Sequence, residues 1–153
     1  IDLVIADKKA LGLKYAAKYK IKKKIINYKN NRIAEKKILL ILEKKKIKFI
    51  CLAGFMKVLS ANFIKRFKEK IINIHPSYLP KYKGLNTSLR ALNNNEKFSG
   101  CTVHYVGTKI DSGKIIIQKK INITKKETET SLDKKIIQEE HKLYPAAIMK
   151  IFN

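Results

Sequence analysis

Two polar side chains, Asn73 and His75, stand at the end of an apolar stretch that begins at Ile71. Because they are two residues apart, they leave an extended strand on the same face. An amide can donate or accept a neutral hydrogen bond, and an imidazole can carry a proton near neutral pH. Open α/β sheets bind their ligands at the carboxyl ends of their strands, so this pair predicts a ligand site.

Each candidate residue also has a purely structural explanation. A lone histidine in a basic protein is more often structural than catalytic, and Asn73 can cap the end of a strand. Asp111 precedes Ser112 and Gly113, where an aspartate favours a turn without any catalytic role. The residue types alone therefore leave both interpretations open.

The sequence around Asn73 and His75 is more specific than the pair itself. The stretch NIHPSYLPKYKGL, which starts at Asn73, resembles the folate-dependent formyltransferases, and within them the phosphoribosylglycinamide formyltransferases. That family carries Asn-x-His followed by Pro-Ser-x-x-Pro-Lys-Tyr/Phe-x-Gly, and a later Asp in a loop like IDSGKII, where Asp111 stands. The resemblance extends over nearly the whole chain, from about Ile1 to Asn153.

The resemblance implies a transferase of purine (IMP) biosynthesis. It would move the formyl group of 10-formyltetrahydrofolate, a co-substrate, to the amine of glycinamide ribonucleotide. The attack builds negative charge on the formyl oxygen and passes a proton from the amine to the departing nitrogen, which requires neither a metal nor a covalent nucleophile. The implied catalytic residues are Asn73 and protonated His75, which donate hydrogen bonds to that oxygen, and Asp111, which orients the imidazole and helps to relay the proton.

The same resemblance implies binding residues. The segment LAGFMKVLS matches a family segment that holds the folate pterin, and Glu140 matches a glutamate that reaches the ribose hydroxyls of the substrate. The alternatives are that Met56 and Leu59 fill the core and that Glu140 lies on a solvated helix face. The implied folate contacts are Met56, Lys57, Val58, Leu59, Asn73 and Arg32, and the implied substrate contacts are Glu140 and Pro76.

Some positions depart from the family pattern. The family often has GLHTH where this chain has GLNTS, so Asn86 and Ser88 replace two histidines. In a gap-free comparison Asn31 takes the place of a folate-side arginine, with Arg32 next to it. The resemblance therefore transfers no histidine role to the first two positions, and at the third it leaves Arg32 as the neighbouring arginine.

The remaining histidines and cysteines predict no further chemistry. His104 matches a family histidine and is expected in the core or in support of the site, whereas His141 is expected to be structural on a helix. Cys51 and Cys101 lie in apolar runs, and buried free thiols fit a reducing cytoplasm. No CxxC or Cys/His cluster predicts a metal.

The net charge of +23 is extreme for 153 residues. It predicts attraction to polyanions or phosphorylated substrates, but Lys, Ile and Asn are over-used everywhere, which favours a compositional bias. Nucleic-acid binders usually use arginine forks, and here arginine occurs only at positions 32, 66 and 90, so nucleic-acid binding is not expected. No uncharged apolar run is long enough for a bilayer span. We expect a cytoplasmic monomer or weak homodimer with no membrane partner.

Alternating apolar periods predict an α/β fold with a mostly parallel twisted sheet covered by helices on both faces, in a Rossmann-like single domain over 1–153. Asp7 and Ser60 are predicted caps, TSLD from Thr130 predicts a capping box, and Pro145 should kink or restart the last helix. Predicted strands cover 3–6, 25–26, 47–53, 71–75, 100–106 and 114–121, and predicted helices 9–19, 33–46, 61–67, 87–92 and one from about 130.

The first residue is Ile1, and family members have an earlier strand and a phosphate-binding loop. We therefore expect this chain by itself to be weak or inactive. Rival interpretations are a methionyl-tRNA formyltransferase, which usually reads SLLPRWRGAAP and carries a second domain, and a formyltetrahydrofolate deformylase, which usually has a different loop. A basic RNA-binding protein without enzymatic activity is the rival from another class; it would bind RNA with a steep salt dependence and would not bind folate.

Overall fold

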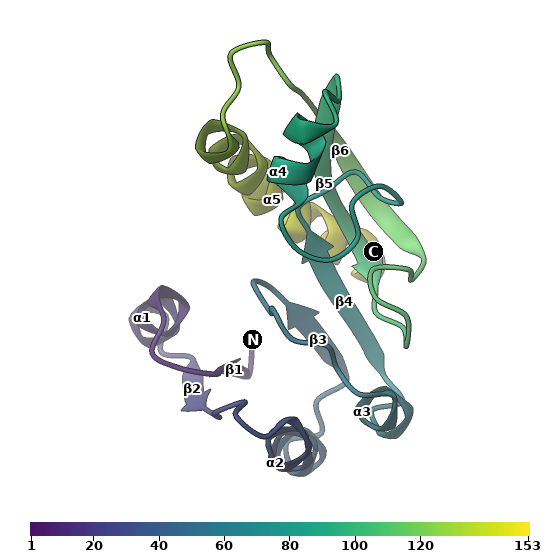
Figure 1. The fold of residues 1–153 in the computed structure, drawn as a ribbon. Coiled ribbons are helices and arrows are strands. Elements are labelled where there is room, and N and C mark those ends of the chain that lie inside the picture. Colours follow the sequence, from purple (N-terminus) through teal and green to yellow (C-terminus); the bar gives the residue numbers. More distant parts are fainter. The chain divides into compact units, whose positions relative to one another are not determined.

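The computed structural model describes residues 1–153. The chain forms two compact units, which are described one at a time. The first unit comprises Ile1–Phe49 and Leu59–Glu69, and the second comprises Ile50–Val58 and Lys70–Asn153. Both units mix helices and strands, as the sequence predicts (Figure 1).

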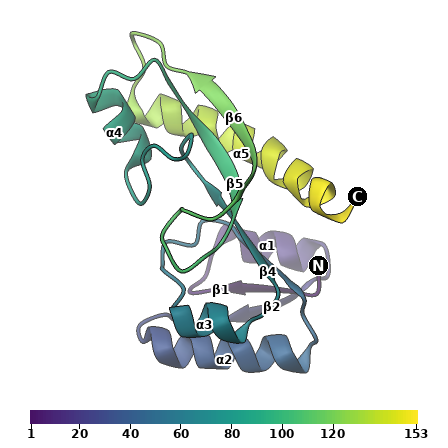
Figure 2. The ribbon, with the colours of Figure 1, turned by 90° about the vertical axis from the view of Figure 1, so that its right-hand side faces the viewer.

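The first unit is built on a short pair of parallel strands, with Leu3 opposite Lys22. Helices α2 and α3 lie side by side in this unit (Figure 2). The predicted strand at residues 3–6 is confirmed, and the other predicted elements are found with boundaries shifted by a few residues. The elements are β1 (Leu3–Ala6), α1 (Leu11–Lys18), β2 (Lys22–Ile25), α2 (Asn31–Lys44) and α3 (Ala61–Arg66).

Side-chain caps start two of these helices. Asn30 accepts a hydrogen bond from the backbone N–H of Ile33 at the start of α2, over 3.1 Å. Ser60 caps α3 as predicted, because its hydroxyl accepts from the N–H of Phe63. The predicted cap at Asp7 is wrong: α1 begins later, after Ala10, which makes no side-chain cap.

The second unit holds most of a four-stranded sheet in the order β3-β4-β5-β6. Strand β5 is buried along almost its whole length and pairs antiparallel with both β4 and β6. The sheet is therefore mixed rather than mostly parallel, although the α/β class is confirmed. Its elements are β3 (Phe49–Leu52, of which Phe49 belongs to the first unit), β4 (Lys70–His75), α4 (Thr87–Asn93), β5 (Phe98–Tyr105), β6 (Ile115–Asn122) and α5 (Glu129–Phe152).

Helix α5 contacts β5 and β6 and buries Leu132 completely. It starts two residues before the predicted capping box, because Thr128 is the N-cap and exchanges hydrogen bonds with Ser131. The helix then runs through Pro145 to Phe152, so the predicted restart does not occur. Solvent also reaches Cys51, contrary to the prediction, whereas Cys101 is buried.

Candidate active site

The candidate site is built on the last residues of β4. The register of β4 and β5 sets Asn73 opposite His104 and His75 opposite Thr102. Residues directly opposite in an antiparallel pair have neighbouring side chains, and positions two apart share a face. Asn73, His75 and His104 therefore leave the same face of the sheet, and His75 is only 5% exposed.

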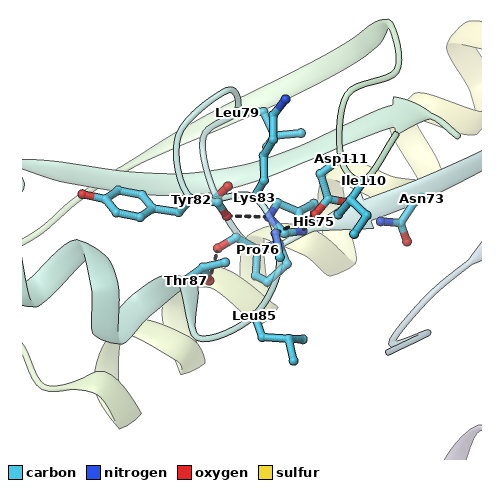
Figure 3. Close-up of polar contacts among 12 residues, drawn as sticks. Asn73, His75, Pro76, Leu79, Tyr82, Lys83, Leu85, Thr87, Ile110 and Asp111 are labelled. Atoms are coloured by element: carbon cyan, nitrogen blue, oxygen red, sulfur yellow. Dashed lines mark hydrogen bonds and ion pairs between the residues drawn. The ribbon is translucent and has the colours of Figure 1, made fainter. Parts of the chain in front are cut away.

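Asp111 reaches this face from the loop between β5 and β6 (Figure 3). Its Oδ2 lies 3.4 Å from Nδ1 of His75 and accepts the N–H of Gly84 over 2.8 Å. The turn places Asp111 at a φ of 43°, and Gly113 leaves no room for a Cβ, which would meet the Tyr105 carbonyl oxygen at 1.7 Å. The loop geometry thus directs the carboxylate toward the predicted histidine.

The pKa of Asp111 lies below its usual value. Burial alone would raise this pKa, but the hydrogen bonds from His104 and from the Gly84 N–H, together with the charge of His75, outweigh it. The carboxylate is therefore ionised near neutral pH and stabilises a proton on a neighbouring imidazole.

His104 joins the three predicted catalytic residues into one cluster. Its side chain is 3% exposed, and its Nε2 lies 3.4 Å from Nδ2 of Asn73 and 3.6 Å from Oδ1 of Asp111. Its Nδ1 donates to the carbonyl of Tyr105 over 2.8 Å, since a carbonyl only accepts. Its Nε2 therefore lies between the Asn73 amide and the Asp111 carboxylate, and the contact at 3.4 Å helps to hold the amide in place.

The second ring nitrogen of His75 is held by the backbone. Nε2 lies 2.9 Å from the carbonyl oxygen of Tyr82, so it must carry the hydrogen (Figure 3). Burial lowers the pKa of His75; the Tyr82 carbonyl and Asp111 oppose this effect, and the charges of His104 and Arg90 add to it. Nδ1 is therefore the nitrogen that gains and loses a proton, next to the carboxylate.

The loop after β3 carries four of the six predicted folate contacts. Met56 and Val58 are 68% and 55% exposed, and Lys57 is also exposed, so Met56 does not fill the core. Gly54 allows the turn, with a φ of 61°. Leu59, in the first unit, is 7% exposed and packs in the core, which is the alternative considered for it. Any ligand contact there would involve its backbone.

The remaining predicted contacts lie on several elements. Glu140 is on α5, where burial and, secondarily, the charge of Asp133 raise its pKa to about 7. It is therefore not simply on a solvated helix face. The Pro76 carbonyl accepts the hydroxyl of Thr87 over 2.7 Å, which fixes the chain after His75. Arg32 lies exposed at the start of α2 in the first unit.

Sequence reasoning missed two contacts that build the site. One is the Tyr82 carbonyl on His75, for which no sequence signal exists because a backbone group carries it. The other is the hydroxyl of Tyr144, which donates to the carbonyl of Leu52 over 2.8 Å and lies 3.3 Å from that of Ile72. It joins the end of β3 to the residue before Asn73. A tyrosine on the inner side of a long helix was the available signal.

Other features of the molecule add no candidate centre. No group of three or more His, Cys, Asp or Glu side chains is arranged to hold a metal ion. A hollow of about 970 Å³ lies in the first unit between α1 and β2, lined among others by Leu11, Lys24 and Ile25, and contains none of the predicted site residues. No helix has both the length and the apolar character needed to cross a bilayer.

Comparison with known proteins identifies the class. Residues 1–148 match the formyl transferase family. The phosphoribosylglycinamide formyltransferase of Bacillus halodurans has a TM-score of 0.93 and 32% identity, covering 100% of this chain and 81% of that one. The enzyme from Anaplasma phagocytophilum has a TM-score of 0.90 and 36% identity, covering 97% and 72%. The chain therefore belongs to the formyl transferase family, and within it to the phosphoribosylglycinamide formyltransferases.

Longer proteins are also similar to this chain. The human trifunctional purine biosynthetic protein adenosine-3 is 39% identical over 99% of this chain, and the Drosophila melanogaster protein of the same name is 39% identical over all of it. The chain spans 15% and 12% of their lengths, respectively.

Proposed function

We propose that the protein transfers the formyl group of 10-formyltetrahydrofolate to the amine of glycinamide ribonucleotide in purine biosynthesis. The observation that carries the proposal is the buried pairing of His75 Nδ1 with Asp111 at the end of β4, in a chain of this family. We also infer a cytoplasmic enzyme that acts as a monomer or weak homodimer on small molecules; similarity to the human purine biosynthetic protein supports the cytoplasmic location.

The reaction breaks one C–N bond and forms another. The amine lone pair attacks the formyl carbon, negative charge develops on the formyl oxygen, and the bond to the folate nitrogen breaks as that nitrogen receives a proton. Asn73 donates an amide N–H to the developing oxyanion, in an orientation supported by its contact with His104. Removing one such donor typically costs about 10²–10³-fold in rate.

His75 and Asp111 handle the proton. Since Nε2 is committed to the Tyr82 carbonyl, Nδ1 takes up the proton released by the amine and returns it toward the folate nitrogen. While protonated, Nδ1–H donates a charge-assisted bond that adds to the stabilisation of the oxyanion. The ionised carboxylate of Asp111, 3.4 Å away, stabilises the imidazolium that exists between these two proton transfers.

The exposed apolar side chains of Met56 and Val58 suit the flat, partly apolar ring system of a folate. We assign Lys57, which lies between them in the same loop, to the same ligand. Glu140 and Pro76 are assigned to the ribonucleotide. In its neutral form, which a pKa of about 7 makes accessible, Glu140 can both donate to and accept from a ribose hydroxyl.

The test is a formyl-transfer assay with both substrates on the purified protein in its full natural length. His75→Asn should lower kcat by about 10²–10³-fold or more, because it removes the proton-carrying group and a donor to the oxyanion. His141→Asn is the matched control, since His141 is exposed on α5. The proposal fails if the wild-type protein does not transfer formyl groups, or if the two variants have equal activity.

A further inference from the structure

Tyr82 holds an unusual backbone conformation next to the site. Its φ is 56°, a left-handed conformation that is uncommon for a residue with a side chain, and its carbonyl faces Nε2 of His75. Such a conformation persists only where surrounding contacts over-determine it. The side chain of Tyr82 supplies those contacts on the side away from the histidine.

The Tyr82 hydroxyl is fixed by two hydrogen bonds just beyond the end of α4. It donates to Oε1 of Glu96 over 2.9 Å and accepts from Nδ2 of Asn94 over 2.9 Å. The guanidinium of Arg90 lies 5.2 Å from the centre of the ring and also donates to the carbonyl of Lys83 over 2.7 Å. Both the side chain and the backbone of this segment are therefore tied to α4 and the residues that follow it.

The held segment touches both members of the proposed proton relay. The Tyr82 carbonyl accepts from Nε2 of His75, and two residues later the N–H of Gly84 donates to Oδ2 of Asp111 over 2.8 Å. The first contact holds His75, and the second holds Asp111. A shift of Tyr82 would change which nitrogen of His75 carries the hydrogen in the neutral ring and would loosen the carboxylate at the same time.

We propose that Tyr82 is a positioning residue for formyl transfer: its hydroxyl, held by Glu96 and Asn94, keeps its own carbonyl on Nε2 of His75 and so commits the neutral imidazole to the tautomer with Nδ1 free toward Asp111. This inference rests on the function proposed above. The groups that face His75 are the Tyr82 carbonyl, the charge of Asp111, and the charges of His104 and Arg90. Of these groups, only the Tyr82 carbonyl belongs to the residue whose hydroxyl is held by Glu96 and Asn94.

The direct test is nitrogen-15 NMR of histidine-labelled protein, with the His75 signals assigned by their loss in His75→Asn. In the wild type, neutral His75 should be the Nε2–H tautomer. In Tyr82→Phe, the tautomers should mix, and the titration midpoint of His75 should move to lower pH, because the Tyr82 carbonyl raises this pKa. Tyr78→Phe is the control; Tyr78 is on the same loop, with its ring edge-on to Phe98.

A kinetic test separates the hydrogen bond from the charge of Glu96. Tyr82→Phe and Glu96→Ala should each lower kcat about 10- to 100-fold with KM changed less than about twofold, as expected when a catalytic group is misplaced. Glu96→Gln keeps an acceptor for the hydroxyl and should restore most of the activity. Lys81→Gln removes the 2.7 Å ion pair with Glu96 and should leave kcat unchanged.

The two proposals fail in different ways. If the wild type does not transfer formyl groups, the function is wrong, and the NMR result still reports on the role of Tyr82. If Tyr82→Phe keeps the wild-type tautomer and midpoint of His75, or if Glu96→Gln is as impaired as Glu96→Ala, the positioning role of Tyr82 is overturned. A lower melting temperature without these changes would indicate a purely structural role.

Discussion

Each unit of the molecule contains a carboxylate largely removed from water, and the two have different partners. Glu35, 4% exposed in the first unit, accepts the N–H of Ser60 over 2.8 Å and also the Ser60 hydroxyl. Asp111 in the second unit accepts one backbone N–H and faces two imidazoles. The donors on Glu35 do not titrate near neutral pH, whereas imidazoles do. Burial of a carboxylate alone therefore does not identify a reactive site. The groups that contact the carboxylate distinguish the two cases.

Exchanging each carboxylate for its amide should separate the two regions most clearly. Asp111→Asn should lower kcat by about 10²–10³-fold, because the imidazolium of His75 loses its counter-charge. Glu35→Gln should keep activity within about threefold but destabilise the fold by roughly 1–3 kcal/mol, since one donor of Ser60 loses its acceptor. Kinetics and denaturant unfolding of both variants measure the contrast. Equal loss of activity in the two would break it.

Glu140 extends the comparison to a third carboxylate. No imidazole and no backbone N–H offsets the effect of burial on its pKa. Its pKa of about 7 in the folded state, against 4.5 unfolded, makes its contribution to stability fully present below pH 4.5 and lost as pH rises through 7. Glu140→Gln stays neutral, so it should melt at a higher temperature than the wild type at pH 8, with the difference vanishing near pH 4.5.

Glu139 provides the matched control for that experiment. Its ion pair with Lys142, at 2.7 Å, lowers its pKa, so its contribution is present above pH 4.5 and lost as pH falls through the folded value. Glu139→Gln should therefore be slightly less stable than the wild type at pH 8, the opposite sign. If both variants shift the melting temperature in the same direction, the burial of Glu140 is not the cause.

The smallest effect is expected on β2, whose residues are exposed throughout. Replacing Lys22, Lys23 and Lys24 with threonine removes three positive charges and keeps good strand formers. The free energy of unfolding should change by about 0.5 kcal/mol per site or less, with kcat unchanged. RNA binding measured across salt concentrations tests the rival view. A salt slope that is steep in the wild type and falls by several units in the variant would show that these charges bind nucleic acid.

The sequence predicted those parts of the site that depend on local pattern. The apolar run that begins at Ile71 predicts the strand, and Asn73 and His75 predict its polar end. Ser60 is a predicted cap because serine is a preferred residue before the first turn of a helix, and its hydroxyl accepts the N–H of Phe63. The start of α5 was misplaced because Thr128 and Ser131 form a box without an acidic residue. Helix caps can be predicted from such local rules. Where two nearby stretches could each form a cap, the sequence does not show which of them begins the helix.

The contacts that escaped prediction join distant positions through backbone atoms. The Tyr82 carbonyl meets His75 only because the loop takes a left-handed turn at a residue other than glycine. The Tyr144 hydroxyl meets Leu52 and Ile72 from a helix many residues later. No spacing rule encodes either contact, since each depends on how whole elements pack. The resemblance to a family therefore added more to the site than periodicity did.

One hairpin carries two of the clustered groups, His104 on β5 and Asp111 in its turn. The turn is closed by the bond from the N–H of Tyr105 to the carbonyl of Lys114, over 2.9 Å. Opening of this end of the hairpin would displace the Asp111 carboxylate and the His104 imidazole together. Exchange of the Tyr105 amide with heavy water thus reports how often this end of the hairpin opens, and it can be measured without any substrate.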